Sequence, residues 1–189
     1  DLNPKKWQDT YDRLKESSQT INQVVSNNPS NTSSNKVLDK YELFPGIFAN
    51  NGQREAIDLI EDFLKSGEEE FTLIGRGGTG KTTIIKKILE EYKGKAGGIT
   101  VAHKAKKVLG KSIGKDKVLT VASALAIKLD ESTGKFQADT FARKQGKLPI
   151  KKMDLIIVDE ASMISPAIYQ EIMSLKKSNA KVIFMGDNA

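Results

Sequence analysis

The stretch FTLIGRGGTGKTTIIKKI, residues 71–88, decides the fold of this chain. Its centre follows the spacing G-x-x-x-x-G-K-T from Gly75 to Thr82, between two apolar runs. Glycines allow the backbone to curl until successive N–H groups point at phosphate oxygens, and a helix that starts directly afterwards adds its positive end. A strand, a glycine-rich loop and a helix are therefore predicted, with a nucleotide bound at the loop. The alternative is a tight glycine turn that binds no ligand.

The residues of the loop have distinct expected roles. Lys81 would bring a mobile positive charge to the β- and γ-phosphates, and the hydroxyl of Thr82 would ligate Mg2+. The residues expected to bind the nucleotide are Gly75, Gly77, Gly78, Thr79, Gly80, Lys81, Thr82 and Thr83.

A second motif, LIIVDE at residues 155–160, supplies two carboxylates. Four consecutive apolar residues suit a strand buried on both faces, which we place next to the strand of the glycine loop. Asp159 would hold Mg2+ and Glu160 would activate water as a general base, so Lys81, Asp159 and Glu160 form the expected catalytic set. An acidic pair also suits an ordinary helix start. Together with the glycine loop, the motif predicts hydrolysis of ATP or GTP.

Gln53, in NGQREAI, is the candidate for recognising the base. A glutamine amide offers both a donor and an acceptor, which match the N6 and N7 edge of adenine. Gln53 is therefore expected to favour ATP, and the alternative is a solvated position at the start of a helix.

Composition excludes several classes of protein and of metal site. The 189 residues, 38% of them hydrophobic, suit one α/β domain with appendages. The chain has no signal-peptide pattern and no apolar run of about 18 residues, so we expect no membrane partner and a cytoplasmic location. Without cysteine and with one histidine, any metal must be held by oxygen ligands.

The net charge of +6 comes from 30 Lys and Arg against 24 Asp and Glu. The positive residues gather at 104–107, 111–117 and 143–152. A basic surface attracts nucleic acid through its phosphates, whereas the alternative is a solvated lysine-rich surface.

Three regions are predicted along the chain. In residues 1–26, Asn3 and Pro4 are typical of a helix start, and apolar side chains follow them at helical spacing. Residues 27–44 are predicted to form a flexible linker rich in Asn and Ser. The first helix either docks a partner, such as a replication protein, or lies on the body of its own domain. Residues 45–189 form the core domain. The chain ends at Ala189 directly after an apolar run, so we expect a fragment of a longer polypeptide.

The core alternates strands and helices, which predicts a parallel α/β sheet with the site at the carboxyl ends of its strands. The expected strands are residues 71–74, 99–102, 117–121, 155–158 and 182–185. The expected helices are residues 52–66, 81–93, 104–112 and 166–177.

The order of the short motifs resembles that of superfamily 1 helicases. In chain order the motifs are NGQREAI, GRGGTGKTT, VAHKAKKVL, TVAS, VDEASM and GDN, which match motifs Q, I, Ia, Ib, II and III. The likeness covers residues 45–189 and is greatest to the Dda- and RecD-like 5′-to-3′ branch. It implies the first RecA-like P-loop domain of an ATP-dependent DNA helicase, with a small hairpin insertion, an N-terminal helical arm and Mg2+ as cofactor.

The resemblance also implies further site residues. Asp187, in the motif III position, would bind nucleotide and link the γ-phosphate to bound DNA. His103, Lys106, Thr120 and Ser123 would contact single-stranded DNA. This sequence departs from the family pattern at Val101-Ala102, where Pro-Thr is usual, and at Ala122, where histidine is usual.

The segment between motifs Ib and II, residues 129–149, suits a hairpin with a turn at 131–134. In the helicase branch such a hairpin acts as a pin that splits the duplex. Phe136 and Phe141 would stack on DNA bases, and the alternative is a surface loop whose phenylalanines pack back on the domain.

Coupling of hydrolysis to translocation requires arginines from a second RecA-like domain of the parent chain. The fragment alone is therefore expected to bind Mg-ATP, to hydrolyse it slowly and not to unwind DNA. Two other functions stay open: a loader or signalling ATPase of another P-loop branch, and a module that recruits a partner through its N-terminal helix.

Overall fold

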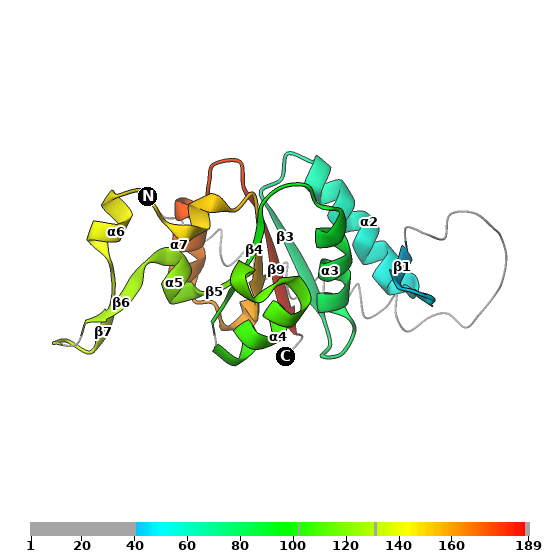
Figure 1. Ribbon diagram of the computed structural model, residues 1–189, viewed down its shortest axis with the longest axis horizontal. Coiled ribbons are helices and arrows are strands. Elements are labelled where there is room, and N and C mark those ends of the chain that lie inside the picture. The colour runs from blue at the N-terminus through cyan, green and yellow to red at the C-terminus, as the bar shows by residue number, and fades with distance from the viewer. Residues whose placement is uncertain (1–40, 102, 131, 188–189) are drawn as a thin grey trace.

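The computed structural model describes residues 41–101, 103–130 and 132–187. The predicted N-terminal helix and most of the predicted linker lie outside these residues. Five parallel strands form the central sheet, in the order β3-β9-β8-β4-β5 (Figure 1). Their bounds are β3 Glu70–Gly75, β4 Ala96–Thr100, β5 Val118–Thr120, β8 Leu155–Asp159 and β9 Lys181–Asp187.

The strand order corrects one prediction. We placed the strand of residues 155–158 next to the strand of the glycine loop, but β9 lies between β8 and β3 and pairs with both. Both β8 and β9 are continuous apolar runs that suit a central position, so the sequence offers no criterion for ordering them. The prediction of a parallel α/β sheet is confirmed.

Helices cover both faces of the sheet, and successive residues of the central strands face opposite sides. In β8, Leu155 and Ile157 pack with the helices on one face, whereas Ile156 and Val158 pack with those on the other. The first face carries α2 Asn51–Lys65, α3 Lys81–Glu91 and α4 His103–Ile113. The second carries α5 Val121–Leu125, the 3-10 turn η3 Pro149–Lys152 and α7 Pro166–Leu175.

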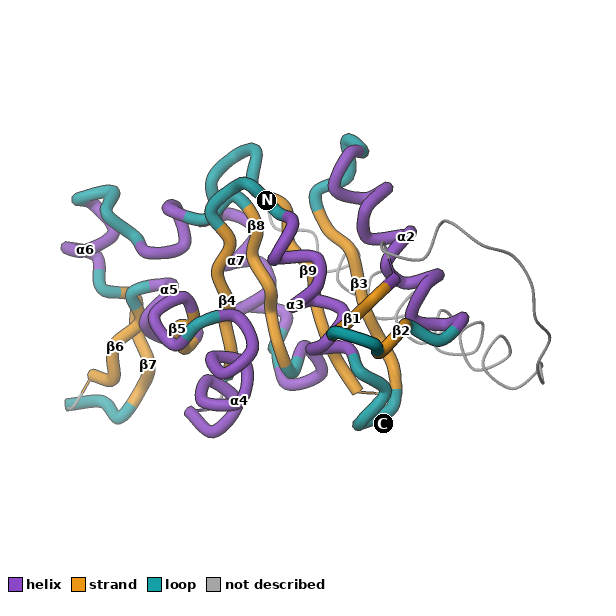
Figure 2. Tube along the Cα trace, turned by 45° about the vertical axis from the view of Figure 1, so that its right-hand side comes forward, coloured by secondary structure: helices purple, strands orange, loops and turns teal. Residues whose placement is uncertain are grey.

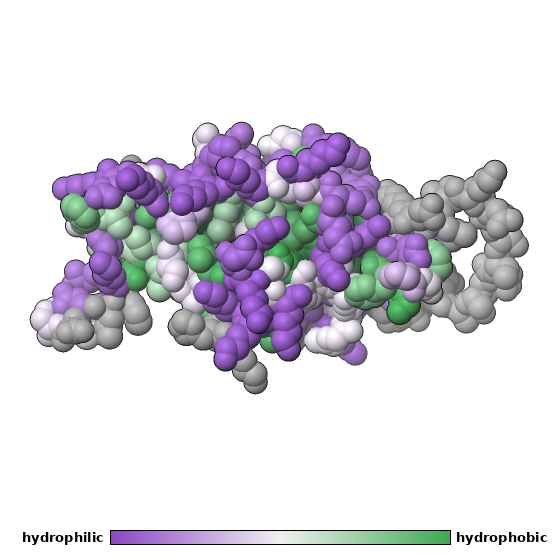
Figure 3. Space-filling model, viewed as in Figure 1, coloured by the Kyte–Doolittle hydropathy of each residue, from purple (hydrophilic) through white to green (hydrophobic). Residues whose placement is uncertain are grey.

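A short antiparallel hairpin precedes the domain core. Its strands are β1 Glu42–Phe44 and β2 Ile47–Phe48, and it lies beside α2 (Figure 2). The hydroxyl of Tyr41 donates to the carboxylate of Asp58 on α2, at 2.9 Å to Oδ2. Residues 42–44 were included in the predicted linker, and in the structure they belong to the folded body. Figure 3 shows apolar surface at this hairpin.

A second antiparallel hairpin extends from the opposite end of the body, after α5 (Figure 1). It consists of β6 Ile127–Asp130 and β7 Lys135–Ala138, and the short helix α6 Thr140–Lys144 follows it. The predicted hairpin insertion is therefore present, and it starts two residues earlier than expected. The remaining 3-10 turns are η2 Lys115–Lys117 and η4 Ala161–Met163.

In the described part of the chain, no helix is long and apolar enough to cross a membrane.

Candidate nucleotide-binding site

The glycine loop connects the carboxyl end of β3 to the first residue of α3, as the motif predicts. Gly80, the residue before α3, has φ of +89°, a left-handed conformation that favours glycine. A Cβ atom at Gly80 would lie 2.5 Å from the Nε2 atom of Gln53. The backbone conformation and the close approach therefore both require glycine at this position.

The side chain of Lys81 is partly buried in the loop and makes three short contacts. Its Nζ atom donates to the carbonyl oxygens of Gly75 at 2.8 Å and Arg76 at 3.0 Å, and it lies 2.6 Å from Oδ1 of Asp187. Since an ammonium group has three N–H donors, its donor capacity is used within the chain. A nucleotide phosphate that binds Lys81 must therefore replace at least one of these partners.

Asp187 reaches Lys81 because β9 pairs with β3 and places Asp187 opposite Gly75. A Cβ atom at Gly77 would lie 3.4 Å from Oδ2 of Asp187, so the carboxylate lies close to the glycine loop. Asp187 thus lies beside the glycine loop, and its role toward a nucleotide stays a prediction.

Replacing Asp187 with asparagine is expected to strengthen binding of ADP in the absence of Mg2+. The Asp187 side chain is 64% exposed. An exposed ion pair contributes about 1 kcal/mol at most, which corresponds to about fivefold in affinity. Titration of the chain with a fluorescent ADP analogue in EDTA measures the effect. The matched control is Asp154→Asn, at the amino ends of the strands. Unchanged or weaker binding by the Asp187 variant would contradict competition between Asp187 and the phosphates for Lys81.

The carboxylates of motif II lie where β8 ends, at the same edge of the sheet as the glycine loop. Glu160 has φ of +55°, which is uncommon for a residue with a side chain and is often found at functional sites. Its Oε2 atom is shielded from solvent and has no hydrogen-bond partner among the described residues. A shielded, unpaired carboxylate oxygen is costly unless a ligand or water completes it, which fits a general base.

Burial raises the pKa of Asp159 above its ordinary value, and the negative charge of Asp187 raises it further. The hydrogen bond from the backbone N–H of Glu160, at 2.9 Å, and the positive charge of Lys81 act in the opposite direction. Additional positive charge at this position would therefore favour the ionised carboxylate.

The residues present fit Mg2+. Both candidate donors, Thr82 and Asp159, are oxygen groups, which this cation prefers. No group of three His, Cys, Asp or Glu side chains in the described ranges could hold a metal by itself. That result agrees with the way Mg2+ is usually bound, through one or two carboxylates together with phosphates and water.

Gln53 lies beside the glycine loop, as expected for a residue near the nucleotide. Its Nε2 atom donates to the carbonyl oxygen of Thr79 at 3.1 Å, and its Oε1 atom accepts from the backbone N–H of Asn50 at 3.0 Å. The second bond belongs to a capping box at the start of α2. Gln53 thus links α2 to the loop, and adenine recognition stays a prediction.

The predicted DNA contacts follow β4 and β5 at the same edge of the sheet. His103 starts α4, and its side chain lies outside the described atoms, while Lys106 is half-buried on the same helix. Thr120 is buried, and its hydroxyl accepts from the backbone N–H of Ser123 as the N-cap of α5. Ser123 is exposed. The structure thus gives Thr120 a capping role that the sequence analysis missed.

The two phenylalanines of the insertion differ. Phe136 is in β7, and its side chain is not described. Phe141 is in α6, directly after the hairpin, and 72% of it is exposed. The alternative that the phenylalanines pack back on the domain is therefore wrong for Phe141.

With this geometry established, comparisons with known proteins decide the family. The model of the AAA domain family AAA_30 matches residues 49–189. The chain belongs to this family. Its α/β P-loop domain, with a five-stranded parallel sheet and small antiparallel hairpins, is the RecA-like fold expected from the sequence.

The resemblance to superfamily 1 helicases is confirmed as a distant relationship. The chain is 30% identical to the ATP-dependent DNA helicase dda of Enterobacteria phage T4 over 141 residues, which are 72% of this chain and 31% of that protein. The chain therefore spans less than a third of this curated relative.

Solved Pif1 helicases share the fold. One, from a study of two coordinating Pif1 helicases at forked double-stranded DNA, is 22% identical with a TM-score of 0.55, over 75% of this chain and 34% of that chain. Another, Bacteroides Pif1 bound to single-stranded DNA, is 20% identical with a TM-score of 0.51, over 75% and 32%. Identity at this level establishes the fold and no more.

Proposed function

We propose that the chain is the ATP-binding motor domain of a DNA helicase of the Dda- and Pif1-like branch, which couples ATP hydrolysis to movement along single-stranded DNA. The arrangement of Lys81, Asp159 and Glu160 at one edge of a parallel sheet carries this proposal, because it supplies the groups that phosphoryl transfer to water needs. The kinship with dda and the exposed hairpin insertion support the DNA part of the proposal.

Each residue has a step in the proposed reaction. Lys81 leaves Asp187 and binds the β- and γ-phosphates, whose negative charge exceeds that of one carboxylate. Asp159 and Thr82 would hold Mg2+, which neutralises the charge that develops on the phosphates. Glu160 takes the proton of the attacking water, and its shielded Oε2 atom is free of competing bonds within the described residues.

The parent protein would supply the remaining parts. Arginines from a second RecA-like domain would stabilise the γ-phosphate in the transition state, and closure of the two domains would shift the DNA by a step. The isolated chain is accordingly proposed to bind Mg-ATP, to hydrolyse it slowly and not to unwind DNA.

Unwinding of tailed duplexes by the full-length parent tests the direction. The proposed 5′-to-3′ motor separates a duplex with a 5′ single-stranded tail and leaves one with a 3′ tail intact. The reverse preference would contradict the proposed direction, and failure on both substrates in the presence of Mg-ATP would contradict the helicase function.

Replacing Phe141 with alanine in the full-length parent is expected to slow unwinding while single-stranded DNA still stimulates ATP hydrolysis. Stacking of an aromatic side chain on a base contributes about 1 to 3 kcal/mol, so a decrease of about tenfold is expected. Parallel unwinding and ATPase assays make the comparison, with Lys144→Ala on the same helix as the control. Unchanged unwinding with intact ATPase activity would contradict a role of Phe141 in separating the DNA strands.

A loader or signalling ATPase is the second candidate, because the same nucleotide site serves many P-loop proteins. The third role, recruitment of a partner by residues 1–26, is compatible with either activity. Deletion of residues 1–36 tests it: loss of partner binding with unchanged nucleotide affinity supports recruitment, and retained partner binding contradicts it.

A further inference from the structure

The hairpin β6–β7 leaves the body through a narrow root. Ala126, between α5 and β6, has φ of +49°, so the chain turns sharply there. On the other side of the root, the backbone N–H of Asp139 donates to the carbonyl oxygen of Ala126 at 2.7 Å. The carboxylate of Asp139 pairs with Nζ of Lys128 at 2.5 Å and also caps α6. These bonds make α6 an extension of the hairpin root.

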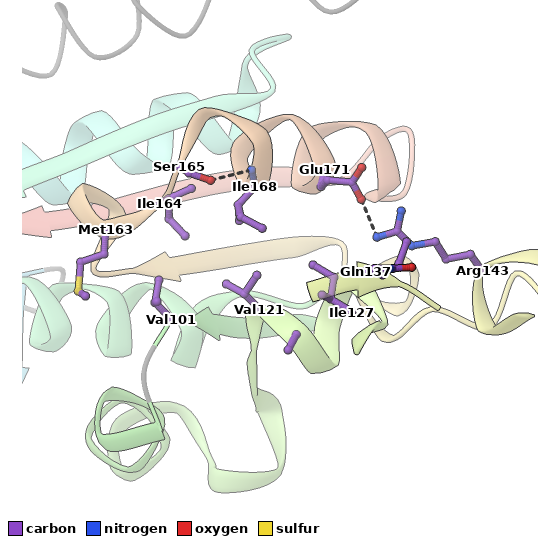
Figure 4. Close-up of a pocket in the computed structure, with 12 residues that line it drawn as sticks. Val101, Val121, Ile127, Gln137, Arg143, Met163, Ile164, Ser165, Ile168 and Glu171 are labelled. Atoms are coloured by element: carbon purple, nitrogen blue, oxygen red, sulfur yellow. Dashed lines mark hydrogen bonds and ion pairs between the residues drawn. The ribbon is translucent and has the colours of Figure 1, made fainter. Parts of the chain in front are cut away.

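One side chain of α6 connects this root to the body. The Nε atom of Arg143 donates to the carbonyl oxygen of Leu125, the last residue of α5, at 3.2 Å. The Nη2 atom of Arg143 lies 2.6 Å from Oε2 of Glu171 on α7. Figure 4 shows this ion pair at one end of a pocket, between the helix that follows the hairpin and the helix that covers the sheet.

A pocket lies beside the ion pair of Arg143 and Glu171. It has a volume of about 460 Å3, and its apolar walls come from α7 and the turn before it on one side and from α5 and β6 on the other. Ile164 and Ile168 face Val121 and Ile127 across it (Figure 4). These side chains also pack against the buried residues that α5 and α7 share, so the start of the hairpin is held to the body by apolar contacts. Helix α6 buries none of its own residues, so the polar contacts of Arg143 join it to α7.

The carboxylate of Glu171 gives an electrostatic reason why Arg143 holds α6 to α7. The Glu171 side chain is partly exposed, but its Oε2 atom is shielded from solvent. Among the described residues no hydrogen bond of good geometry reaches that atom, and Arg143 supplies its positive charge. A shielded carboxylate that loses its counter-charge is destabilised, so removal of Arg143 favours separation of α6 from α7.

We propose that Arg143 is a positioning residue that holds the β6–β7 hairpin in the orientation in which it meets the DNA duplex. The inference rests on the proposed helicase function. Through Glu171 and Leu125, Arg143 fixes α6 to the body, and through Asp139, α6 fixes the hairpin. Without Arg143 the motor still hydrolyses ATP and moves, but the hairpin no longer keeps its place at the junction.

The first test uses the 189-residue chain and depends on no activity. Amide hydrogen exchange is measured over residues 127–138 for the wild type, Arg143→Ala, Arg143→Lys and the control Lys144→Ala, an exposed lysine of the same helix. Faster exchange confined to this segment and α6 in Arg143→Ala, with Lys144→Ala unchanged, is the expected result. Equal exchange in all four proteins would overturn the inference, and so would faster exchange throughout the domain, because it would indicate general unfolding.

The second test uses the full-length parent. Arg143→Ala is expected to lower the rate of duplex unwinding about tenfold or more while DNA-stimulated ATP hydrolysis is retained. A small displacement of a group that acts on its substrate can lower the rate by that factor. Arg143→Lys keeps the charge beside Glu171 and is expected to restore most of the unwinding. Unwinding by Arg143→Ala equal to that of Lys144→Ala overturns the inference, as does an equal loss of ATPase activity. A wild-type parent that fails to unwind contradicts the proposed function instead, and hydrogen exchange still tests the positioning role.

Discussion

Replacing Lys81 with alanine is expected to weaken binding of Mg-ATP about 100-fold, because hydrogen bonds to charged groups contribute about 1.5 to 3 kcal/mol and Lys81 is proposed to bind two phosphates. Its ammonium group contacts Gly75, Arg76 and Asp187 at the position where the phosphates are expected. No other lysine of the described residues contacts Asp187 in an ion pair. Isothermal titration of the 189-residue chain measures the affinity.

The control for this prediction is Lys86→Ala. Lys86 is on the same helix, α3, and pairs with Glu90 on the helix surface. A similar loss of affinity in both variants would indicate a general effect of charge, and unchanged affinity of the Lys81 variant would place the nucleotide elsewhere.

Replacing Glu160 with glutamine is expected to lower the ATPase kcat of the full-length parent by about 10² to 10⁴, the usual contribution of a positioned general base. The affinity for ATP is expected to stay close to that of the wild type, because glutamine has nearly the same shape and Glu160 acts on water. Its left-handed backbone and shielded Oε2 atom are the features that single it out. Steady-state kinetics with single-stranded DNA present, and nucleotide titration, separate the two parameters.

Asp154→Asn is the matched control. Asp154 directly precedes β8 and pairs with Lys177 at the amino edge of the sheet, far along the strand from Glu160. Its substitution should leave kcat unchanged. A fall in affinity of the Glu160 variant that accounts for the whole loss of activity would contradict a role as base.

The sequence alone predicted the motifs and the parallel sheet because each depends on local chemistry. The glycine loop and the apolar run before Asp159 need little context, and both are where the pattern indicates. The sequence could not predict which of β8 and β9 lies next to β3, because the buried apolar runs of the two strands are equivalent in composition. Strand β4 was predicted too late because Gly97 and Gly98 are poor strand formers. A Cβ atom at Gly98 would lie 2.8 Å from Leu109, so close packing of α4 explains the glycine.

Long-range pairs were the least predictable part of the site. The contact between Lys81 and Asp187 joins residues that only the pairing of β3 with β9 brings together. Arg143 gave no distinct signal, since it stands in a basic segment with several lysines, and its pairing with Glu171 depends on how α6 packs beside α7. The capping role of Thr120 could have been found, because threonine directly before a helix is a common N-cap.

The ATPase rate of the full-length parent, measured with and without single-stranded DNA, tests the central claim most directly, with Lys81→Ala as the control for contaminating activity. The proposed motor predicts a large stimulation by DNA that the Lys81 substitution abolishes. An equal rate with and without DNA would contradict a DNA motor and would favour a loader or signalling ATPase, with the basic segments as ordinary protein surface.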